Sequence, residues 1–328
     1  MITPIQIYIF SFGFYTTGGV ELLHQLAFEL NKYSVVNAQL YYFEKPDRLP
    51  QPLQPQIYTD RYHTKYVNEK LINPPVVIFP ETLAYAANAK DFKDSLKIIY
   101  WESVDNYYHD NVPEHLKDVF PIDCLHLTQS YYATDHVTNK LHVPKTNILS
   151  CTDYLSEEFF STPSTTKERQ NVVTYNPRKL RGKNNTPFVQ RLFASLEDEN
   201  IITFPLEHYS TKDLIKLLDN SKLYMDFGNH PGKDRIPREA AIRGSCVMTG
   251  LTGAARFNQD IYIPGKYKIA DTEENIPKII DRIHYIFNNF SICTKDFDLY
   301  REKIKREKAL FELEVKDLVK TIVERSNK

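Results

Sequence analysis

Short apolar runs alternate with helical patterns along most of this chain, and this alternation restricts its fold more than any other feature. The apolar runs predict strands over residues 6–11, 35–43, 76–79, 97–101, 123–127, 147–150, 171–175, 201–204, 222–227 and 246–249. Apolar residues at helical spacing predict helices over residues 18–30, 81–89, 130–141, 187–196, 212–218, 274–289 and 296–325. Strands separated by helices favour parallel sheets whose strands are joined by crossover helices.

The length of 328 residues favours two domains, each with a core of its own. Residues 161–170 are polar and show no periodicity, so we place the boundary there. We therefore expect an α/β protein with two Rossmann-like, doubly wound domains that face each other across a cleft. These domains are expected over residues 1–160 and 171–295, and residues 296–328 are expected to form a long helix that packs back on the body.

Composition excludes several classes of function. The net charge of −1 gives no overall attraction to nucleic acid, so any anion site must be local. The chain has four cysteines and no CxxC pair, which gives little support for a zinc site and suits a reducing cytoplasm: Cys124, Cys151, Cys246 and Cys293. No signal-peptide pattern opens the chain, and no apolar run approaches the ~20 residues that span a bilayer. We expect a cytoplasmic protein. Any association with the membrane is expected to be peripheral, at its inner face.

Residues 223–249 carry the densest set of functional side chains, arranged as a strand, a loop, a helix start and a second strand. In open α/β sheets, ligands bind outside the carboxyl ends of the strands, and a helix N-terminus there attracts anions. The predicted anion-binding side chains of this segment are His230, Lys233, Arg235 and Arg238. This pattern indicates a site for a phosphorylated ligand.

Two side chains of the same segment suggest further chemistry. Glu239, at the helix start, is expected to accept hydrogen bonds from ribose or sugar hydroxyls. His230 is expected to donate to a phosphate or to act as an acid or base near neutral pH. The structural alternatives are a turn capped by Asp226 and a helix dipole balanced by Glu239.

Two other stretches are candidates for the same anion. Gly18 and Gly19 follow the first strand and allow close approach of a ligand to the backbone, although the absence of G-x-G-x-x-G argues against a dinucleotide site. The loop after residues 171–175 holds several cations that suit a diphosphate: Arg178, Lys179, Arg181 and Lys183. A plain tight turn and a solvated basic loop are the structural alternatives.

Carboxylates follow two strands of the first half. Glu81 comes after residues 76–79, and Glu102 and Asp105 come after residues 97–101. A carboxylate at such a strand end is suited to take a proton from an acceptor hydroxyl. We take Glu81 and Asp105, together with Glu239 and His230, as the candidate catalytic residues. His109, His126 and His208 show no metal-ligand spacing with carboxylates. Neither a metal nor another cofactor is expected.

Several strings together resemble the two-domain GT-B glycosyltransferases. Residues 17–21 and 26–30 are similar to their Gly-Gly loop and first helix, and residues 226–228 with 237–247 are similar to their donor-site strand, acidic helix start and next strand. A narrower resemblance is to bacterial polysaccharide-locus glycosyltransferases of the O-antigen and capsule type, through residues 101–106, 175–177 and 230–240.

The resemblance implies metal-independent transfer of a sugar from a nucleotide-activated donor to a hydroxyl of a glycan or glycolipid acceptor in surface polysaccharide synthesis. It also implies that Glu239 holds the donor ribose or sugar. Many retaining members carry another glutamate eight residues earlier, where this chain has Pro231, so retention and inversion are both open. The alternative functions are a catalytically inert nucleotide-sugar-binding subunit and a sugar-phosphate epimerase or phosphorylase.

Overall fold

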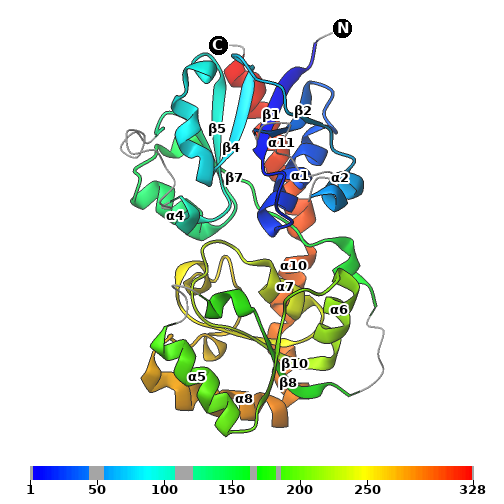
Figure 1. Cartoon of the computed structure of the whole chain (residues 1–328), viewed down its shortest axis with the longest axis vertical. Coiled ribbons are helices and arrows are strands. Elements are labelled where there is room, and N and C mark those ends of the chain that lie inside the picture. Colours follow the sequence, from blue (N-terminus) through cyan, green and yellow to red (C-terminus); the bar gives the residue numbers. More distant parts are fainter. Residues whose placement is uncertain (1–2, 44–54, 108–120, 163–167, 182–185, 327–328) are drawn as a thin grey trace. The chain divides into compact units, whose positions relative to one another are not determined.

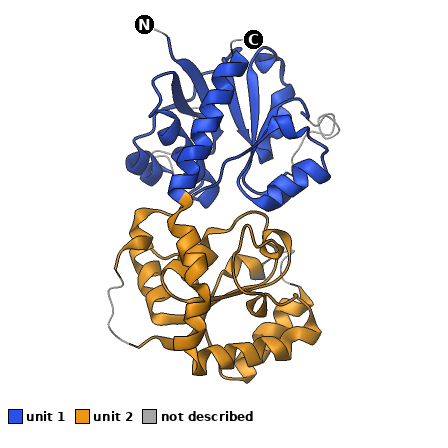
Figure 2. Ribbon diagram, turned by 180° about the vertical axis from the view of Figure 1, so that it is seen from behind, with its two compact units in different colours: residues 1–153, 308–328 blue, residues 154–307 orange. Residues whose placement is uncertain are grey.

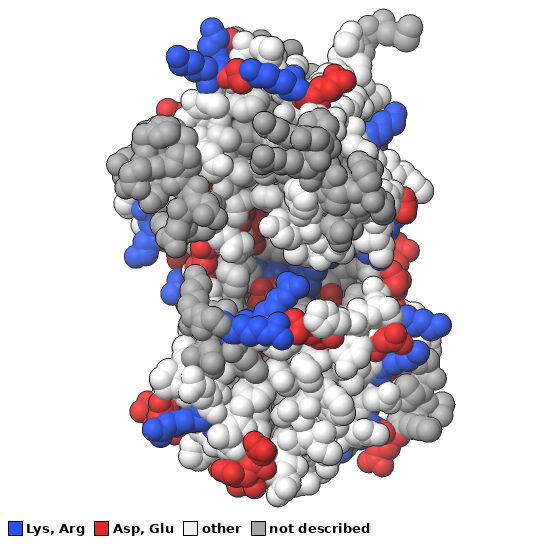
Figure 3. All heavy atoms as spheres, in the orientation of Figure 1, with Lys and Arg blue, Asp and Glu red and all other residues white. Residues whose placement is uncertain are grey.

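The chain divides into two compact units (Figure 2). Unit 1 comprises residues 1–153 and 308–328, and unit 2 comprises residues 154–307. The computed structural model describes residues 3–43, 55–107, 121–162, 168–181 and 186–326. On the face drawn in Figure 3, basic and acidic side chains are interspersed, in keeping with the small net charge.

Unit 1 is built on a seven-stranded sheet in the order β3–β2–β1–β4–β5–β6–β7, with every neighbouring pair parallel (Figure 1). The strands are β1 (Ile5–Ser11), β2 (Val36–Tyr42), β3 (Tyr66–Val67), β4 (Val76–Pro80), β5 (Leu96–Trp101), β6 (Leu125–Thr128) and β7 (Ile148–Ser150). The helices among them include α1 (Gly18–Leu30), α2 (Gln56–Tyr62), α4 (Tyr131–Asn139) and the 3₁₀ helix η2 (Glu81–Asn88).

The order of the strands reverses between β1 and β4. From β1 the chain moves outward to β2 and β3, then returns to β4 beside β1 and moves outward the other way. Because crossover connections are right-handed, the connections of the two halves lie on opposite faces of the sheet. The carboxyl ends of β1 and β4 therefore form a topological switch point, the place where open α/β sheets bind ligands.

Unit 2 repeats this plan with four parallel strands in the order β11–β10–β8–β9. They are β8 (Gln170–Tyr175), β9 (Ile202–Pro205), β10 (Ser221–Asp226) and β11 (Cys246–Thr249). The helices include α5 (Pro187–Asp198), α6 (Thr211–Asn220), α7 (Arg235–Ile242), α8 (Ile276–Asn288), α9 (Phe290–Cys293) and α10 (Asp298–Lys305). Here the switch point lies between β8 and β10.

Apolar burial explains why the predicted strands form. All five residues of β4 and all six of β10 are buried, as expected of parallel strands covered on both faces. Helix α1 is buried over most of its length, including its four leucines, and the Thr17 hydroxyl caps it by accepting from the Val20 amide at 3.4 Å. The prediction of two doubly wound α/β sheets is confirmed.

The expected C-terminal helix over residues 296–325 is present with a break at Arg306. Helix α10 ends at Lys305 and helix α11 (Glu307–Ser326) begins after it. The chain passes from unit 2 to unit 1 at this break. Helix α11 packs on unit 1, since Glu314 accepts from the Thr152 amide at 2.6 Å and Arg325 donates to the Thr146 carbonyl at 3.0 Å.

One buried ion pair links helices α6 and α7 of unit 2, and its arginine also contacts the backbone near the start of this unit. Arg243, at the end of α7, donates from Nε and Nη2 to the two carboxylate oxygens of Asp219 on α6, at 2.7 and 2.6 Å. Its Nη1 also donates to the Phe159 carbonyl at 3.0 Å. Both charged side chains are almost fully buried, so neither has water as a substitute partner.

We predict that Arg243→Ala lowers the free energy of unfolding by about 3–5 kcal/mol, because it leaves the buried Asp219 carboxylate unpaired. Lys216→Ala, which breaks the exposed pair with Asp213 on the same helix, is the control and is expected to change little. Denaturant unfolding measures both, and equal effects of the two substitutions would contradict the prediction.

Candidate functional site

Charged side chains converge at the switch point of unit 2. Strand β10 ends at Asp226, and residues 227–234 lead from it into helix α7. The 3₁₀ helix η7 (Pro177–Leu180) follows the neighbouring strand β8 and brings Lys179 to the same place. The sheet thus joins two of the stretches that the sequence marked as anion sites.

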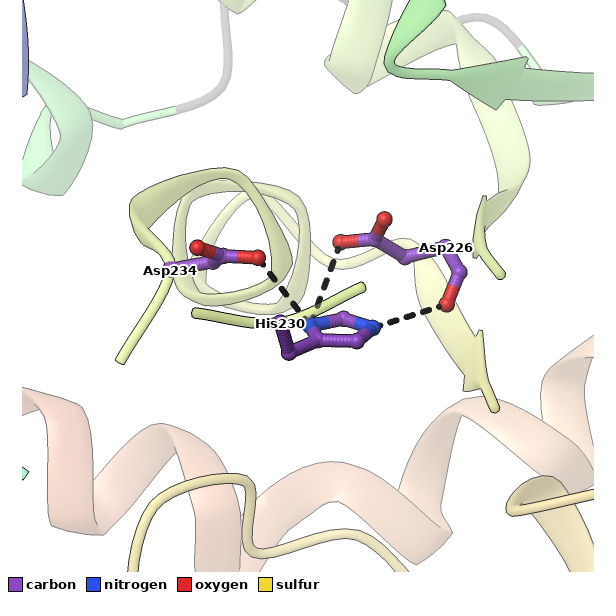
Figure 4. A group of neighbouring side chains, drawn as sticks. All are labelled: Asp226, His230 and Asp234. Atoms are coloured by element: carbon purple, nitrogen blue, oxygen red, sulfur yellow. Dashed lines mark hydrogen bonds and ion pairs between the residues drawn. The ribbon is translucent and has the colours of Figure 1, made fainter. Parts of the chain in front are cut away.

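The Lys179 ammonium lies inside a ring of three protein groups. Its Nζ is 2.7 Å from Asp226 Oδ1, 2.9 Å from Asp234 Oδ2 and 3.2 Å from His230 Nδ1. Figure 4 shows the Asp226, His230 and Asp234 side chains directed toward one another from the strand end, the loop and the helix start. Lys179 is only 7% exposed, so these protein groups replace its hydration shell.

His230 connects the two ends of the loop. Its Nε2 donates to the Asp226 carbonyl at 3.1 Å, since a carbonyl only accepts, and its Nδ1 lies 3.0 Å from Asp234 Oδ2. The ring is fully buried. His230 therefore fixes the path of the chain from β10 to α7. The sequence analysis predicted phosphate binding or acid–base chemistry for His230, and it did not predict this structural role.

The electrostatics of the ring favour ionised groups. Burial alone would raise the pKa of Asp234, but the Lys179 charge and the hydrogen bond with His230 outweigh it and hold that pKa well below its usual range. Burial would likewise lower the pKa of Lys179, but Asp226 and Asp234 outweigh it and raise that pKa above its ordinary value. The ammonium and the Asp234 carboxylate are thus both charged at neutral pH.

The same three groups also have the composition of a metal site. One ligand atom each from Asp226, His230 and Asp234 lies within 4.8 Å of the others, and one nitrogen with two carboxylate oxygens suits a divalent transition metal. The Lys179 ammonium, however, contacts all three groups. With Lys179 in this position, a positive charge of the protein already lies against all three groups.

Two more of the predicted cations are paired with one carboxylate that the sequence analysis missed. Arg238 is fully buried, and its Nη1 donates to Glu307 Oε2 at 2.8 Å. Lys233 Nζ lies 2.8 Å from Glu307 Oε1. Arg238 also donates from Nη2 to the Lys233 carbonyl at 3.2 Å. These contacts hold the start of α7 against the first residue of α11.

A glycine and an aspartate secure the loop from its other side. A Cβ atom at Gly253, which has φ of +53°, would lie 2.0 Å from the His230 carbonyl oxygen, so only glycine fits there. The Gly228 amide donates to Asp271 Oδ2 at 2.8 Å. Burial raises the pKa of Asp271. Neither Gly253 nor Asp271 stood out in the sequence, because each acts through a contact with a distant loop.

The remaining predicted residues of unit 2 differ in exposure. Glu239 lies on the first turns of α7 and is 9% exposed, and Arg235 beside it is half-buried. Arg178 is exposed, and its amide donates to the side chain of Asn176 at 3.1 Å. Lys183 lies outside the described residues.

The candidates of unit 1 lie near its own switch point. Gly18 and Gly19 are the first residues of α1, which follows β1 after a connection over residues 12–17. Glu81 follows β4, is 3% exposed and accepts from the Glu102 amide at 3.0 Å. Burial raises the pKa of Glu81 to about 7. Asp105 faces another neighbour, since it accepts from the Tyr132 hydroxyl of α4 at 3.2 Å.

Comparison with known proteins bears on the fold. No protein-family model and no curated protein sequence matches the chain. Solved structures do. A glycosyltransferase from Rickettsia africae has 11% identical residues and a TM-score of 0.63, and the match covers 98% of both chains. HepE from Anabaena, in complex with UDP-glucose, has 10% identity and a TM-score of 0.66 over 97% of this chain and 100% of its own.

The lipopolysaccharide outer core galactosyltransferase WaaB gives a third match, with 13% identity and a TM-score of 0.63 over 98% of this chain and 100% of its own. At such identities the matches show the fold alone. This chain has the fold of GT-B glycosyltransferases. Among the described residues, none of the helices combines the length and apolar composition needed to cross a bilayer.

We predict that Lys179→Met destabilises the protein in a pH-dependent way. In the wild type, the depressed pKa of Asp234 contributes stability above the unfolded pKa of about 3.9, and this is lost only as the pH falls through the lower folded pKa. Without the ammonium, burial favours the protonated form of Asp234, so the variant loses stability as the pH rises past that value.

The stability difference between wild type and Lys179→Met is therefore expected to widen from pH 4 to pH 7. Urea unfolding at several pH values measures it, and the exposed neighbour substitution Arg178→Ala is the control. A difference that stays constant over this range would show that Lys179 does not hold the Asp234 carboxylate in its charged form.

Proposed function

We propose that this protein is a glycosyltransferase that moves a sugar from a nucleotide-activated donor to a hydroxyl group of an acceptor. The observation that carries the proposal is the position of residues 226–239: they place charged groups at the switch point of unit 2, in a chain that has the GT-B fold over nearly its whole length. The presence of UDP-glucose in the HepE structure supports a nucleotide-sugar ligand.

The donor is proposed to bind at the carboxyl ends of β8 and β10. Glu239 would accept hydrogen bonds from ribose or sugar hydroxyls at the start of α7. The half-buried Arg235 and the exposed Arg178 are more exposed than Lys179, Lys233 and Arg238, and they are proposed to meet the phosphates. Cations there would stabilise the charge that collects on the leaving phosphate as the glycosidic bond breaks.

The buried cations take a supporting part in this proposal. Lys179 and Arg238 are enclosed in ion pairs, so they would fix the shape of the loop rather than touch the donor. Lys233 is 7% exposed and is paired with Glu307. It would therefore reach a donor phosphate only at the edge of the phosphate site. A preorganised loop aims its backbone amides before the donor arrives.

The acceptor is proposed to be a glycan or a lipid-linked glycan in the synthesis of a surface polysaccharide. The likeness of the fold to a lipopolysaccharide outer core galactosyltransferase supports it. A second candidate function is a catalytically inert nucleotide-sugar-binding subunit. The observation that favours it is Pro231, which stands where many retaining members have a glutamate.

We predict that one family of nucleotide sugars raises the melting temperature of the purified protein. A ligand that binds only the folded state stabilises it by mass action. The measurement is a thermal-shift screen with UDP-, GDP-, ADP-, dTDP- and CMP-sugars. Absence of any shift in the folded protein would contradict the proposed donor class, and binding without release of nucleotide would favour the inert subunit.

Glu239→Gln is expected to weaken donor binding and to lower turnover by at least about tenfold, because a hydrogen bond to a charged group contributes about 1.5–3 kcal/mol. Glu197→Gln, an exposed change on α5 of the same unit, is the control. Both variants are compared by nucleotide release and by melting temperature. Equal turnover in the two variants would remove Glu239 from the site.

We also predict that turnover survives a chelator, because the Lys179 ammonium supplies a positive charge among the possible metal ligands. Lys179→Ala removes that ammonium, so Zn²⁺ is expected to raise the melting temperature of this variant more than that of the wild type. Loss of wild-type turnover with EDTA and its recovery with a divalent metal would contradict metal independence.

A further inference from the structure

The two edges of the sheet in unit 2 differ. Strand β9 is the last in the order β11–β10–β8–β9, and within the described part of the chain it pairs with β8 alone. At the opposite edge all four residues of β11 are buried, and the Ile269 amide donates to the Thr249 carbonyl at 3.0 Å, so the chain itself covers that strand. Three of the four residues of β9 are exposed. An edge strand presents N–H and C=O groups on its outer side, so β9 is able to pair with a further strand.

The exposed side chains of β9 are large and apolar. Ile202 is 57% exposed and Phe204 is 40% exposed. Exposed edges are commonly protected by lysine or by inward-pointing charges, whereas β9 (Ile202–Pro205) contains no charged residue. Ile202 and Phe204 alternate along the strand and therefore lie on the same face, where an added strand places its own side chains beside them.

An open hollow of about 760 Å³ lies against β9 and helix α5 (Figure 1). Its volume is within the range of about 300–1,000 Å³ that is typical of ligand sites. Consecutive strand residues direct their side chains to opposite faces, so a hollow that contacts both Ile202 and Thr203 follows the edge of the strand. The rest of its lining comes from α5 and the turn after it: Phe193, Ala194, Leu196, Glu197, Asn200 and Ile201.

Carboxylates lie at one end of this hollow. Helix α5 ends in Glu197 and Asp198, with Glu199 as its cap, and all three are exposed. Neither the Glu197 nor the Asp198 side chain pairs with a described residue. Negative charge at the carboxyl end of a helix is unfavourable, because the negative end of the helix dipole is there. Only residues 200–201 separate this end of α5 from β9, so a basic group beside the start of β9 would balance the charge.

We infer that the β9 edge of unit 2 docks an extended segment of a partner protein, apolar at alternate positions and basic at the end that lies beside the start of β9. The backbone of the segment adds a strand to the sheet, and its apolar side chains pack on Ile202 and Phe204. Its basic side chains pair with Glu197 and Asp198. The inference goes beyond the proposed function, because none of these residues belongs to the proposed donor site.

A second copy of this chain fits the edge less well. A two-fold axis pairs β9 with itself in antiparallel orientation, and Pro205, the last of its four residues, has no amide proton to donate. Strand β9 also brings no basic side chain to the carboxylates at the end of α5. The charge beside the edge therefore favours a basic partner segment.

The first test uses a fluorescent synthetic peptide in which valine and threonine alternate between flanking arginines. Fluorescence anisotropy with the intact chain measures its dissociation constant. Glutamates in place of the arginines are expected to weaken binding at least about tenfold, because repulsion replaces attraction. Prolines at alternate positions are expected to abolish binding, because proline donates no hydrogen bond to a neighbouring strand. Equal binding of the three peptides, or binding of none, would overturn the inference.

The second test changes the surface of the protein. Ile202→Ala is expected to weaken binding of the arginine peptide about three- to tenfold, because it removes an apolar contact. Ile292→Ala on α9 of the same unit is the control, since Ile292 is 62% exposed, and it is expected to bind the peptide as the wild type does. If both variants bind equally well, β9 is not the docking edge.

Reversal of the charge gives a gain of binding as well as a loss. The double variant Glu197→Lys with Asp198→Lys is expected to bind the glutamate peptide more tightly than the arginine peptide. Lysine at the carboxyl end of a helix is favourable, so the melting temperature is expected not to fall. An unchanged preference for the arginine peptide would show that these carboxylates do not select the partner.

Amide hydrogen exchange locates the bound peptide. The arginine peptide is expected to slow exchange in residues 201–205, and protection elsewhere alone would contradict docking at β9. Sedimentation of the wild type tests the other occupant: a dimer that Ile202→Ala dissociates would assign the edge to a second copy and overturn the inference. Donor binding is measured separately with nucleotide sugars, so failure of the proposed function leaves these outcomes unaffected.

Discussion

The candidate site of unit 2 depends on one interaction, the enclosure of the Lys179 ammonium by Asp226, His230 and Asp234. Burying a charge is costly unless protein groups replace its water, and here each of three chain segments supplies one such group. The ammonium in turn keeps the Asp234 carboxylate charged at the start of α7. The loop before α7 therefore has one defined path, and the start of that helix is held in place before any ligand arrives.

The two units share one sheet plan but place different charged groups at the switch point. Each has a parallel sheet whose strand order reverses, and each collects charged groups at that reversal. In unit 2 a lysine is enclosed by acids, whereas in unit 1 the Glu102 carboxylate lies against Gly19 at the start of α1. Cations near the switch point of unit 2 suit a phosphorylated donor.

The sequence predicted the strands and the strand-end clusters because these follow from local patterns. Apolar runs such as β4 and β10 are recognisable without knowledge of their neighbours. The direction in which a charged side chain points is not local. Lys179 looks like one cation of a solvated loop, yet it is buried, and Arg238 pairs with Glu307, which lies 69 residues away along the chain. The contact of Glu102 with Gly19 likewise depends on the pairing of distant strands.

The central claim is that a nucleotide sugar binds at the carboxyl ends of β8 and β10. Amide hydrogen exchange with and without the best-bound nucleotide sugar tests it most directly. The account predicts slower exchange on binding in residues 176–181 and 226–242. Binding that leaves exchange in both segments unchanged, while protecting other parts of the chain, would contradict the assignment of the donor site.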